Sequence, residues 1–424
     1  MIGSKRMLRL ARTSGVIAVA CCGVTATATA GEVLAWQRQP GSEDRDYFSR
    51  LATDAAGNVY MVGETWGSLG GANKGISDAW VRKYNPYGRV LWQRQPGTEA
   101  NDGARGVATD AAGDVYLAGD TYGSFGSANK GGSDAWVRKY DASGRLLWQR
   151  QPGSEANDSV QGVATDAAGD VYLAGETDGS LAGANKGFSD AWVRKYDPSG
   201  RLLWQRQPGT EGYDWAKGVA TNASGDVYVA GHTDGSLGGA NKGSLDAWVR
   251  KYDASGRLLW QRQPGTEGND YALGVATDAA GDVYLAGETG GSLGGVNKGG
   301  SDAWVRKYDA AGRLLWQRQP GTDDSDGASD VATDAAGDVY VAGYTLGSLG
   351  GANQGGADAW IAKYDSSGRL LWQRQPGTES NEQADGVATG AAGDVYLAGD
   401  TYGSFGSANK GGSDAWLMKF SPTE

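Results

Sequence analysis

The chain of 424 residues is poor in the residues that build most metal and redox sites. It has two cysteines, Cys21 and Cys22, and a single histidine, His232, which leaves no classical zinc site, cysteine nucleophile or repeated Ser-His-Asp set. Ten prolines without a G-X-Y period exclude collagen. The formal charge of −11 disfavours nucleic acid and anionic membranes as partners, because both are bound through clustered Lys and Arg.

Residues 1–30 have a composition of their own. Four basic residues between positions 5 and 12 precede an uncharged run over 15–30 that ends in Ala-Thr-Ala. This pattern predicts a signal peptide over 1–30 and a secreted protein, extracellular or periplasmic. The run is shorter than the roughly 20 residues that span a bilayer, so we expect no stable membrane insertion. The alternative, lipoprotein processing at Cys21 or Cys22, lacks the leucine that usually precedes such a cysteine.

The rest of the chain is one motif repeated seven times. The segment WQRQPG recurs every 56 residues, starting at Trp36, Trp92, Trp148, Trp204, Trp260, Trp316 and Trp372. These repeats leave no room for a linker or a second domain, so residues 31–424 are predicted to form one domain. The chain is also tryptophan-rich, with 14 of its 16 tryptophans in repeated positions.

Each repeat is predicted to hold four β-strands. In the second repeat, apolar runs over 106–110 and 114–119 are joined by a DAAGD turn, and runs over 135–140 and 145–151 by a DASG turn. No segment has a helical period of useful length. Four strands in a repeat of this size are typical of the blade of a β-propeller. The sequence therefore predicts an all-β, seven-bladed β-propeller with four antiparallel strands per blade.

The phase of the repeat predicts how the ring closes. The chain enters with an outer strand over 33–39 and ends with a third strand over 414–420. The last blade therefore lacks its own outer strand, and we expect the N-terminal strand to pair with it and remove the open edge.

The repeat resembles a known family. The pattern DAAGDVYLAGETxGSLGGANKGGSDAWVRKYDASGRLLWQRQ is similar to the bacterial β-propeller repeat called SBBP, and the resemblance extends over residues 33–420. It implies a secreted or surface propeller and no defined reaction. Residues 141–148 also look like the tryptophan-docking motif of quinoprotein propellers, which usually have eight blades with a calcium and quinone site. We interpret Trp148 and its equivalents as packing pegs between blades.

The repeats differ mainly on one face of the predicted ring. Turns inside each hairpin lie on one face, called the bottom, and the other connections lie on the opposite face, called the top. Bottom turns are nearly identical. Variable triplets, such as 47–49 and 215–217, come just before the first strand of each repeat on the top face. The two tryptophans outside the repeat pattern, Trp66 and Trp215, both lie on this face.

A ligand is expected on the top face, either a glycan or a protein. Aromatic rings beside carboxylates stack on sugars and bind hydroxyls, or dock a basic, aromatic-rich partner. The alternative is loop variation without constraint. The expected ligand-binding residues are Tyr47, Trp66, Tyr122, Tyr213, Trp215, Tyr271, Tyr344, Asp120, Glu176 and His232.

Metal and general-base chemistry has little support. His232 stands where other repeats carry Glu or Asp, and we interpret it as a neutral replacement rather than a metal ligand or general base. The GGANKGGSD loop offers oxygen ligands for calcium but lacks the dense Asp spacing of a calcium loop, so Asn129 and Asp134 are predicted to be turn residues. No cofactor is expected, with calcium as the alternative. Lys139 is expected to pair with Asp110.

The near-identity of the repeats favours a non-enzymatic binding or interaction scaffold that is monomeric. Residues 111–136 and 391–416 have the same sequence, which leaves little room for a unique catalytic pocket. The alternative is a carbohydrate-active enzyme, a glycosidase or lyase, that uses the top-face carboxylates.

The signal peptide gives a direct prediction. Protein recovered from the export pathway should begin at or near Gly31, because small residues precede the expected cleavage site. N-terminal sequencing of the purified protein measures this. An intact Met1 on cytoplasmic protein would contradict it.

Overall fold

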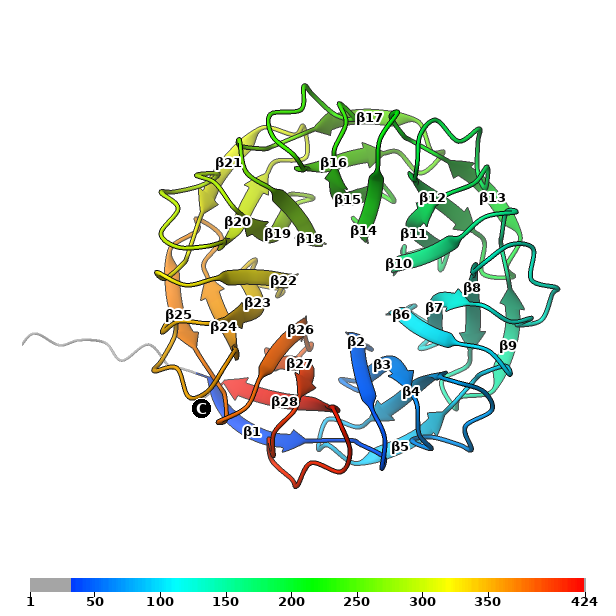
Figure 1. Ribbon diagram of the computed structural model, residues 1–424, viewed down its shortest axis with the longest axis horizontal. Helices are drawn as coiled ribbons and strands as arrows, with labels where there is room; N and C mark the ends of the chain where they lie inside the picture. The colour runs from blue at the N-terminus through cyan, green and yellow to red at the C-terminus, as the bar shows by residue number, and fades with distance from the viewer. Residues whose placement is uncertain (1–31, 423–424) are drawn as a thin grey trace, which may run out of the picture.

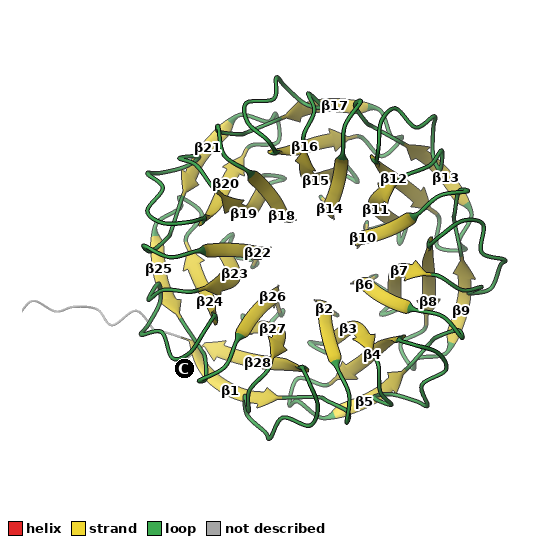
Figure 2. Cartoon of the chain, in the orientation of Figure 1, coloured by secondary structure: helices red, strands yellow, loops and turns green. Residues whose placement is uncertain are grey.

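The computed structural model describes residues 32–422 and shows seven four-stranded antiparallel sheets arranged as blades around a common axis (Figure 1). The predicted signal peptide lies outside the described residues. From 32 to 422 all regular structure is β (Figure 2), and no helix capable of crossing a bilayer occurs in that range. The predicted all-β propeller of seven blades is confirmed.

Each blade has four strands, ordered from the axis outwards. The innermost strands are β2 (Asp46–Thr53), β6 (Asp102–Thr109), β10 (Asp158–Thr165), β14 (Asp214–Thr221), β18 (Asp270–Thr277), β22 (Asp326–Thr333) and β26 (Glu382–Thr389). The second strands are β3 (Val59–Thr65), β7 (Val115–Thr121), β11 (Val171–Thr177), β15 (Val227–Thr233), β19 (Val283–Thr289), β23 (Val339–Thr345) and β27 (Val395–Thr401).

The third strands are β4 (Asp78–Tyr84), β8 (Asp134–Tyr140), β12 (Asp190–Tyr196), β16 (Asp246–Tyr252), β20 (Asp302–Tyr308), β24 (Asp358–Tyr364) and β28 (Asp414–Pro422). The outer strands are β5 (Val90–Arg94), β9 (Leu146–Arg150), β13 (Leu202–Arg206), β17 (Leu258–Arg262), β21 (Leu314–Arg318), β25 (Leu370–Arg374) and β1 (Glu32–Arg38). Blades are numbered from the one that contains β2 to the one that contains β26.

The bottom turns form because their side chains satisfy their own backbone. In blade 1, Asp54 Oδ1 accepts hydrogen bonds from the backbone N–H groups of Ala56 and Asn58. Gly57 has a φ of 76°, the left-handed conformation that a turn of this kind requires at that position. The DAAGD-type sequences therefore act as hairpin turns, as predicted.

Apolar residues are buried between blades rather than within them. Seven hydrophobic clusters occur in the described part of the chain, and each combines residues from two consecutive blades. Between blades 2 and 3, for example, Tyr116 and Val137 pack against Leu173 and Trp192, and all four are fully buried. At about 25 cal/mol per Å² of apolar surface removed from water, these interfaces supply most of the driving force for folding.

Conserved repeat positions also connect the blades through polar groups. The indole N–H of Trp148 donates a hydrogen bond of 2.9 Å to the carbonyl of Pro198, in the bottom turn of the next blade. Trp148 is therefore a peg between blades, as predicted. Within blade 2, the Lys139 ammonium lies 3.2 Å from an Asp110 oxygen and 3.0 Å from an Asp114 oxygen, which confirms the expected pairing.

A closed belt of hydrogen bonds links the seven innermost strands. The hydroxyl of Thr109 donates to the carbonyl of Thr53 in the preceding blade, at 2.8 Å. The same bond recurs at every junction, and the last one joins Thr53 to the carbonyl of Thr389. The full set of donors is Thr53, Thr109, Thr165, Thr221, Thr277, Thr333 and Thr389.

The ring closes as the phase of the repeats predicts. Strand β1 pairs antiparallel with β28, from Glu32 opposite Pro422 to Arg38 opposite Leu417. The Gln39 side chain extends the closure, since its amide donates to Asp414 and its carbonyl accepts from the N–H of Phe405. Figure 1 shows the blue N-terminal strand beside the red C-terminal one.

Closure by β1 gives a stability prediction. Deleting residues 32–39 should lower the melting temperature by on the order of ten degrees or more, because it exposes the β28 edge and removes Trp36 from the blade 7–blade 1 cluster. Differential scanning calorimetry measures this, and adding a synthetic 31–40 peptide should raise the melting temperature again. Tyr87→Ser, at an exposed bottom turn, serves as the neutral control. A deletion protein that melts like the parent would contradict the closure.

Candidate binding site at the channel mouth

The variable triplets lie inside the innermost strands, which corrects the prediction that they precede them. Strand β2 begins at Asp46, and Tyr47 pairs with Glu64 of β3. A β-bulge between Phe48 and Arg50 lets the ladder continue past the variable residue Ser49, and the same irregularity occurs in all seven blades. The varying side chains therefore surround the upper end of the central channel, called here the channel mouth.

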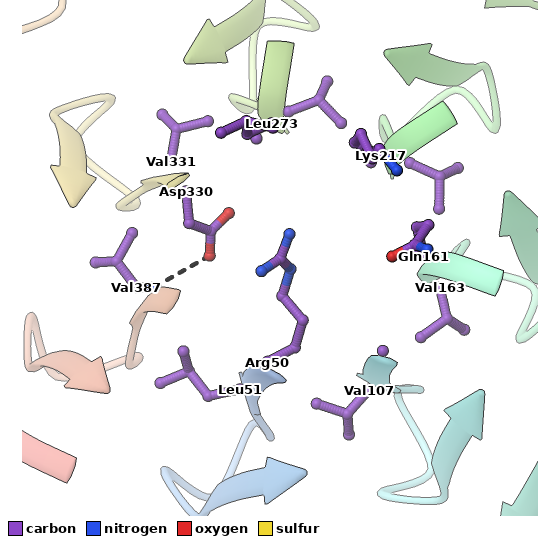
Figure 3. A pocket seen from close by; sticks show the side chains of 16 residues that line it. Arg50, Leu51, Val107, Gln161, Val163, Lys217, Leu273, Asp330, Val331 and Val387 are labelled. Carbon is purple, nitrogen blue, oxygen red and sulfur yellow. Dashed lines mark hydrogen bonds between the residues drawn. The ribbon is translucent and has the colours of Figure 1, made fainter. Parts of the chain in front are cut away.

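The channel below the mouth is narrow and mostly uncharged. A cavity of about 190 Å³ is lined by the innermost strands (Figure 3). At the strand position of Arg50, five of the seven blades carry glycine and one carries Asp330. A Cβ at Gly218 would come 2.8 Å from Val275 Cγ1, so neighbouring strands approach too closely for most side chains there. Arg50 extends towards the channel axis and donates to the carbonyl of Asp385 at 3.0 Å. Asp330 accepts from the N–H of Val387 at 3.1 Å.

Seven side chains at the ends of the second strands form a ring around the mouth, called the mouth ring. It consists of Glu64, Asp120, Glu176, His232, Glu288, Tyr344 and Asp400. Most of its carboxylates have protein partners. The Arg105 guanidinium bridges two blades, at 3.1 Å from Glu64 and 3.0 Å from Asp120. Glu176 accepts hydrogen bonds from Ser159 and Gln161, and Lys217 lies 3.6 Å away.

Blade 7 carries a negative side chain at the position where blade 2 carries the positive Arg105. Asp400 and Asp120 belong to the identical 26-residue segments, but the residue that corresponds to Arg105 in blade 7 is Asp385. Burial, together with the charge of Asp385, holds the pKa of Asp400 well above its ordinary value. Burial raises the pKa of Asp385 to about 6, against the opposing effect of Arg50. The same segment therefore carries a paired carboxylate in blade 2 and a like-charge pair in blade 7.

Aromatic rings form a continuous stack at blades 3 to 5, called the aromatic stack. It runs inwards from Phe188, which is 66% exposed, through Tyr213, which is 40% exposed, to the half-buried Trp215. The ring centroids are 5.0 Å and 5.1 Å apart, with interplanar angles of 16° and 10°. His232 follows at 4.9 Å from Trp215, and Tyr271 meets His232 edge-on at 4.9 Å. The stack therefore reaches from the rim to the channel mouth.

His232 is held neutral inside this stack. Burial, helped by Lys217, lowers the pKa of its imidazole to about 3. Its Nδ1 is buried and has no hydrogen-bond partner in the described residues. The indole N–H of Trp248 in the same blade also lacks a partner there, whereas the equivalent Trp192 donates to the carbonyl of Glu176. A base with so low a pKa is poorly suited to general-base catalysis near neutral pH.

The other predicted residues are scattered around the mouth. Tyr47 and Trp66 form an edge-on pair at 5.5 Å in blade 1, where a hydrogen bond with Tyr402 raises the pKa of Tyr47. Tyr122 is 53% exposed on blade 2. Tyr344 donates to Glu288 at 2.8 Å, and burial raises its pKa to about 12.

The structure thus brings together four of the ten predicted residues, Tyr213, Trp215, His232 and Tyr271, and adds Phe188 to them. The missed partners at the mouth are Arg105, Lys217, Asp385, Arg50 and Asp330. Arg50 and Asp330 replace a glycine that the other five blades share, and Arg105, Lys217 and Asp385 occupy the most variable position of the triplets. An aligned comparison of the seven copies finds both positions.

The polar side chains of the GGANKGGSD loop form hydrogen bonds with neighbouring protein groups. Asn129 donates to the carbonyl of Tyr122, and Asp134 accepts from the N–H of Lys130 and from Gln151. Asn129 and Asp134 therefore act as turn residues, as predicted. Within residues 32–422, no group of three or more His, Cys, Asp or Glu side chains is placed to hold a metal ion.

Comparisons with known proteins show what the repeat and the fold are similar to. A family model for a β-propeller repeat, SBBP, matches residues 147–182. The regulatory protein FlaEY of Caulobacter vibrioides is 26% identical over 232 residues, which cover 49% of this chain and 24% of that protein. The matched part of the chain therefore spans about a quarter of that relative's length.

Solved structures are similar to this chain at low sequence identity. The structure of Sqt1 from Chaetomium thermophilum covers 93% of this chain and all of its own, with a TM-score of 0.50 and 8% identity. A gluconolactonase, XC5397 from Xanthomonas campestris, matches 75% of this chain and 85% of its own, with a TM-score of 0.40 and 12% identity. The Sqt1 match shows the propeller fold alone.

The like-charge pair of blade 7 gives a pH prediction. Because the pKa of Asp385 is raised to about 6 in the folded protein, its contribution to stability is greatest below its ordinary pKa and is lost as the pH rises through about 6. Asp385→Asn should therefore increase the free energy of unfolding by about 1–3 kcal/mol at pH 7.5 and change it little at pH 3.5. Urea unfolding at the two pH values measures this.

The identical segment in blade 2 supplies the control. Asp120→Asn should destabilise the protein at pH 7.5, because it removes one of the two carboxylates that hold Arg105. If both substitutions change stability in the same direction, the difference between blades 2 and 7 does not come from Arg105 and Asp385.

Proposed function

We propose that this chain, an SBBP-type β-propeller repeat protein, is exported and acts as a non-enzymatic binding scaffold that holds a glycan or protein ligand at the top face of the ring. The scaffold is monomeric and needs no cofactor. Closure of the ring gives every blade two neighbours, so the top ends of the innermost strands form a rigid frame for a binding surface.

The observation that carries this proposal is the concentration of sequence differences at one end of the channel. Bottom turns are nearly the same in every blade, whereas the mouth holds the aromatic stack, the Tyr47–Trp66 pair and the mouth ring. Phe188, Tyr122 and Tyr402 remain more than half exposed, and exposed aromatic side chains of this size are typical of contact surfaces.

Several features favour binding over turnover. Arg105 pairs with Glu64 and Asp120, and the carboxylate of Glu288 accepts the hydroxyl of Tyr344. Carboxylates occupied in this way serve poorly as the acid and base of a glycosidase. The relative FlaEY bears the name of a regulatory protein, which is in keeping with a binding role.

A ligand screen tests the proposal. Purified protein lacking residues 1–30 is screened against a glycan array and, by crosslinking, against proteins of the producing cell's surface, with and without calcium, and each ligand found is assayed for turnover. Trp66→Ala or Trp215→Ala should weaken binding by about 1–3 kcal/mol, because half-buried rings at the mouth anchor the ligand. Tyr87→Ala on the bottom face should leave the Kd unchanged. Equal, negligible effects at all three positions, or turnover of the ligand, would contradict the proposal.

A further inference from the structure

The top face carries grooves where consecutive blades meet. One of about 600 Å³ lies beside blade 4 and is lined by Thr210, Glu211, Gly212, Asp234, Gly235 and Ser236. Grooves of about 690 and 660 Å³ occupy the corresponding places at blades 3 and 1. Each is a shallow, open and polar surface of hydroxyls, carboxylates and backbone groups.

The six residues that line the groove at blade 4 include no aromatic side chain, but this groove differs from the other two because aromatic residues are hydrogen-bonded to its lining. The N–H of Phe188 donates to the carbonyl of Gly212 at 3.1 Å, and the N–H of Tyr213 donates to Asp234 at 2.7 Å. The exposed end of the aromatic stack therefore borders this groove. The positions of Phe188 and Tyr213 hold Gly132 and Asn157 at the blade 3 groove, and Gly412 and Arg45 at the blade 1 groove.

The inner end of the stack differs from its blade 3 counterpart in hydrogen bonding. In blade 3, Glu176 stands in the mouth ring, where its Oε1 accepts two side-chain hydrogen bonds and its Oε2 is buried without a partner in the described residues. In blade 4, His232 takes that place with an Nδ1 that is buried and unpartnered there, and Trp248 lacks the bond that Trp192 makes. His232 therefore replaces a charged, hydrogen-bonded carboxylate with an aromatic ring that packs on Trp215 and Tyr271.

We infer that the blade 4 groove and the aromatic stack bind a saccharide chain, an inference that rests on the proposed binding function. Phe188 and Tyr213 are 66% and 40% exposed at the outer end of the stack, and the apolar C–H faces of sugar rings pack on exposed aromatic side chains. Hydroxyls and carboxylates of the groove, such as Ser236 and Glu211, are partners for sugar hydroxyls.

The local charge favours a neutral ligand at the inner end of the stack. His232 is uncharged at neutral pH, and Lys217 lies beside Glu176. The carboxylates of the groove itself do not single it out, because the grooves at blades 1 and 3 also contain acidic residues. The neighbouring aromatic stack distinguishes this groove, and its exposed rings suit a ligand with apolar ring faces. Because aromatic faces beside carboxylates also attract cations, the salt dependence of binding decides between a neutral saccharide and a basic ligand.

The test uses variants of the aromatic stack in which a residue of blade 3 or blade 4 is replaced by the one that another blade carries at the same position, so that each replacement already occurs in this fold. They are Phe188→Gly, Tyr213→Asn and Trp215→Ser. Ile76→Gly, at the position of Phe188 in blade 1 and 60% exposed, is the matched control. Each protein is titrated calorimetrically with neutral linear oligosaccharides of six units, β-1,4-linked glucose, α-1,4-linked glucose and β-1,4-linked N-acetylglucosamine, at 50 and 500 mM salt.

The expected result is binding of at least one oligosaccharide with a Kd below 10 mM that changes less than twofold with salt. Tyr213→Asn and Trp215→Ser should each weaken it at least tenfold, and Ile76→Gly less than twofold. Melting temperatures within a few degrees of the parent show that the variants are folded. The absence of oligosaccharide binding, or binding that the three variants leave unchanged, would overturn the saccharide inference.

A protein ligand separates this inference from the proposed function. If a crosslinked protein partner loses affinity in the variants of the aromatic stack while all three oligosaccharides fail to bind, the binding scaffold stands and the saccharide inference is wrong. A tenfold loss of affinity between 50 and 500 mM salt would likewise point to a basic partner and overturn the saccharide inference.

Discussion

The structure depends on apolar packing between blades, because no blade has a hydrophobic core of its own. Each of the seven clusters takes its residues from two neighbours, so a blade is stable only when both of its sides are covered. This makes closure of the ring a condition of stability. The pairing of β1 with β28 closes the ring at its outside, and the threonine belt closes it around the channel.

Because packing between the blades holds the ring together, the residues at the channel mouth can vary without loss of the fold. The pegs, the Lys–Asp pairs and the bottom turns hold the ring in nearly the same way seven times, and residues such as Trp148 and Lys139 have little freedom to change. At the bulge of the innermost strands the side chains face the channel instead. A single chain therefore tolerates a guanidinium bridge in blade 2 and a pair of like charges in blade 7.

Much of the fold could be predicted from the sequence, because the length and number of the repeats determine the architecture. The 56-residue period and the phase of the first and last strands give the number of blades and the closure. The boundary of the innermost strand could not be read, since the residues before Gly106 do not alternate in polarity and the bulge that accommodates them is a backbone feature. Composition pointed to the top face, but only the packing of blades 3 to 5 shows which aromatic side chains meet.

The closed threonine belt has one further consequence. Its hydrogen bonds all run in the same rotational sense, from each blade to the one before, and the bond across the chain termini between Thr53 and Thr389 is the same as the six others. Along the inner wall, the junction at which the chain begins and ends is therefore physically equivalent to the rest. Circular permutation at any of the connections that lead from an outer strand into the next blade preserves this wall, so the linear order of the gene is only one of seven that specify the same ring.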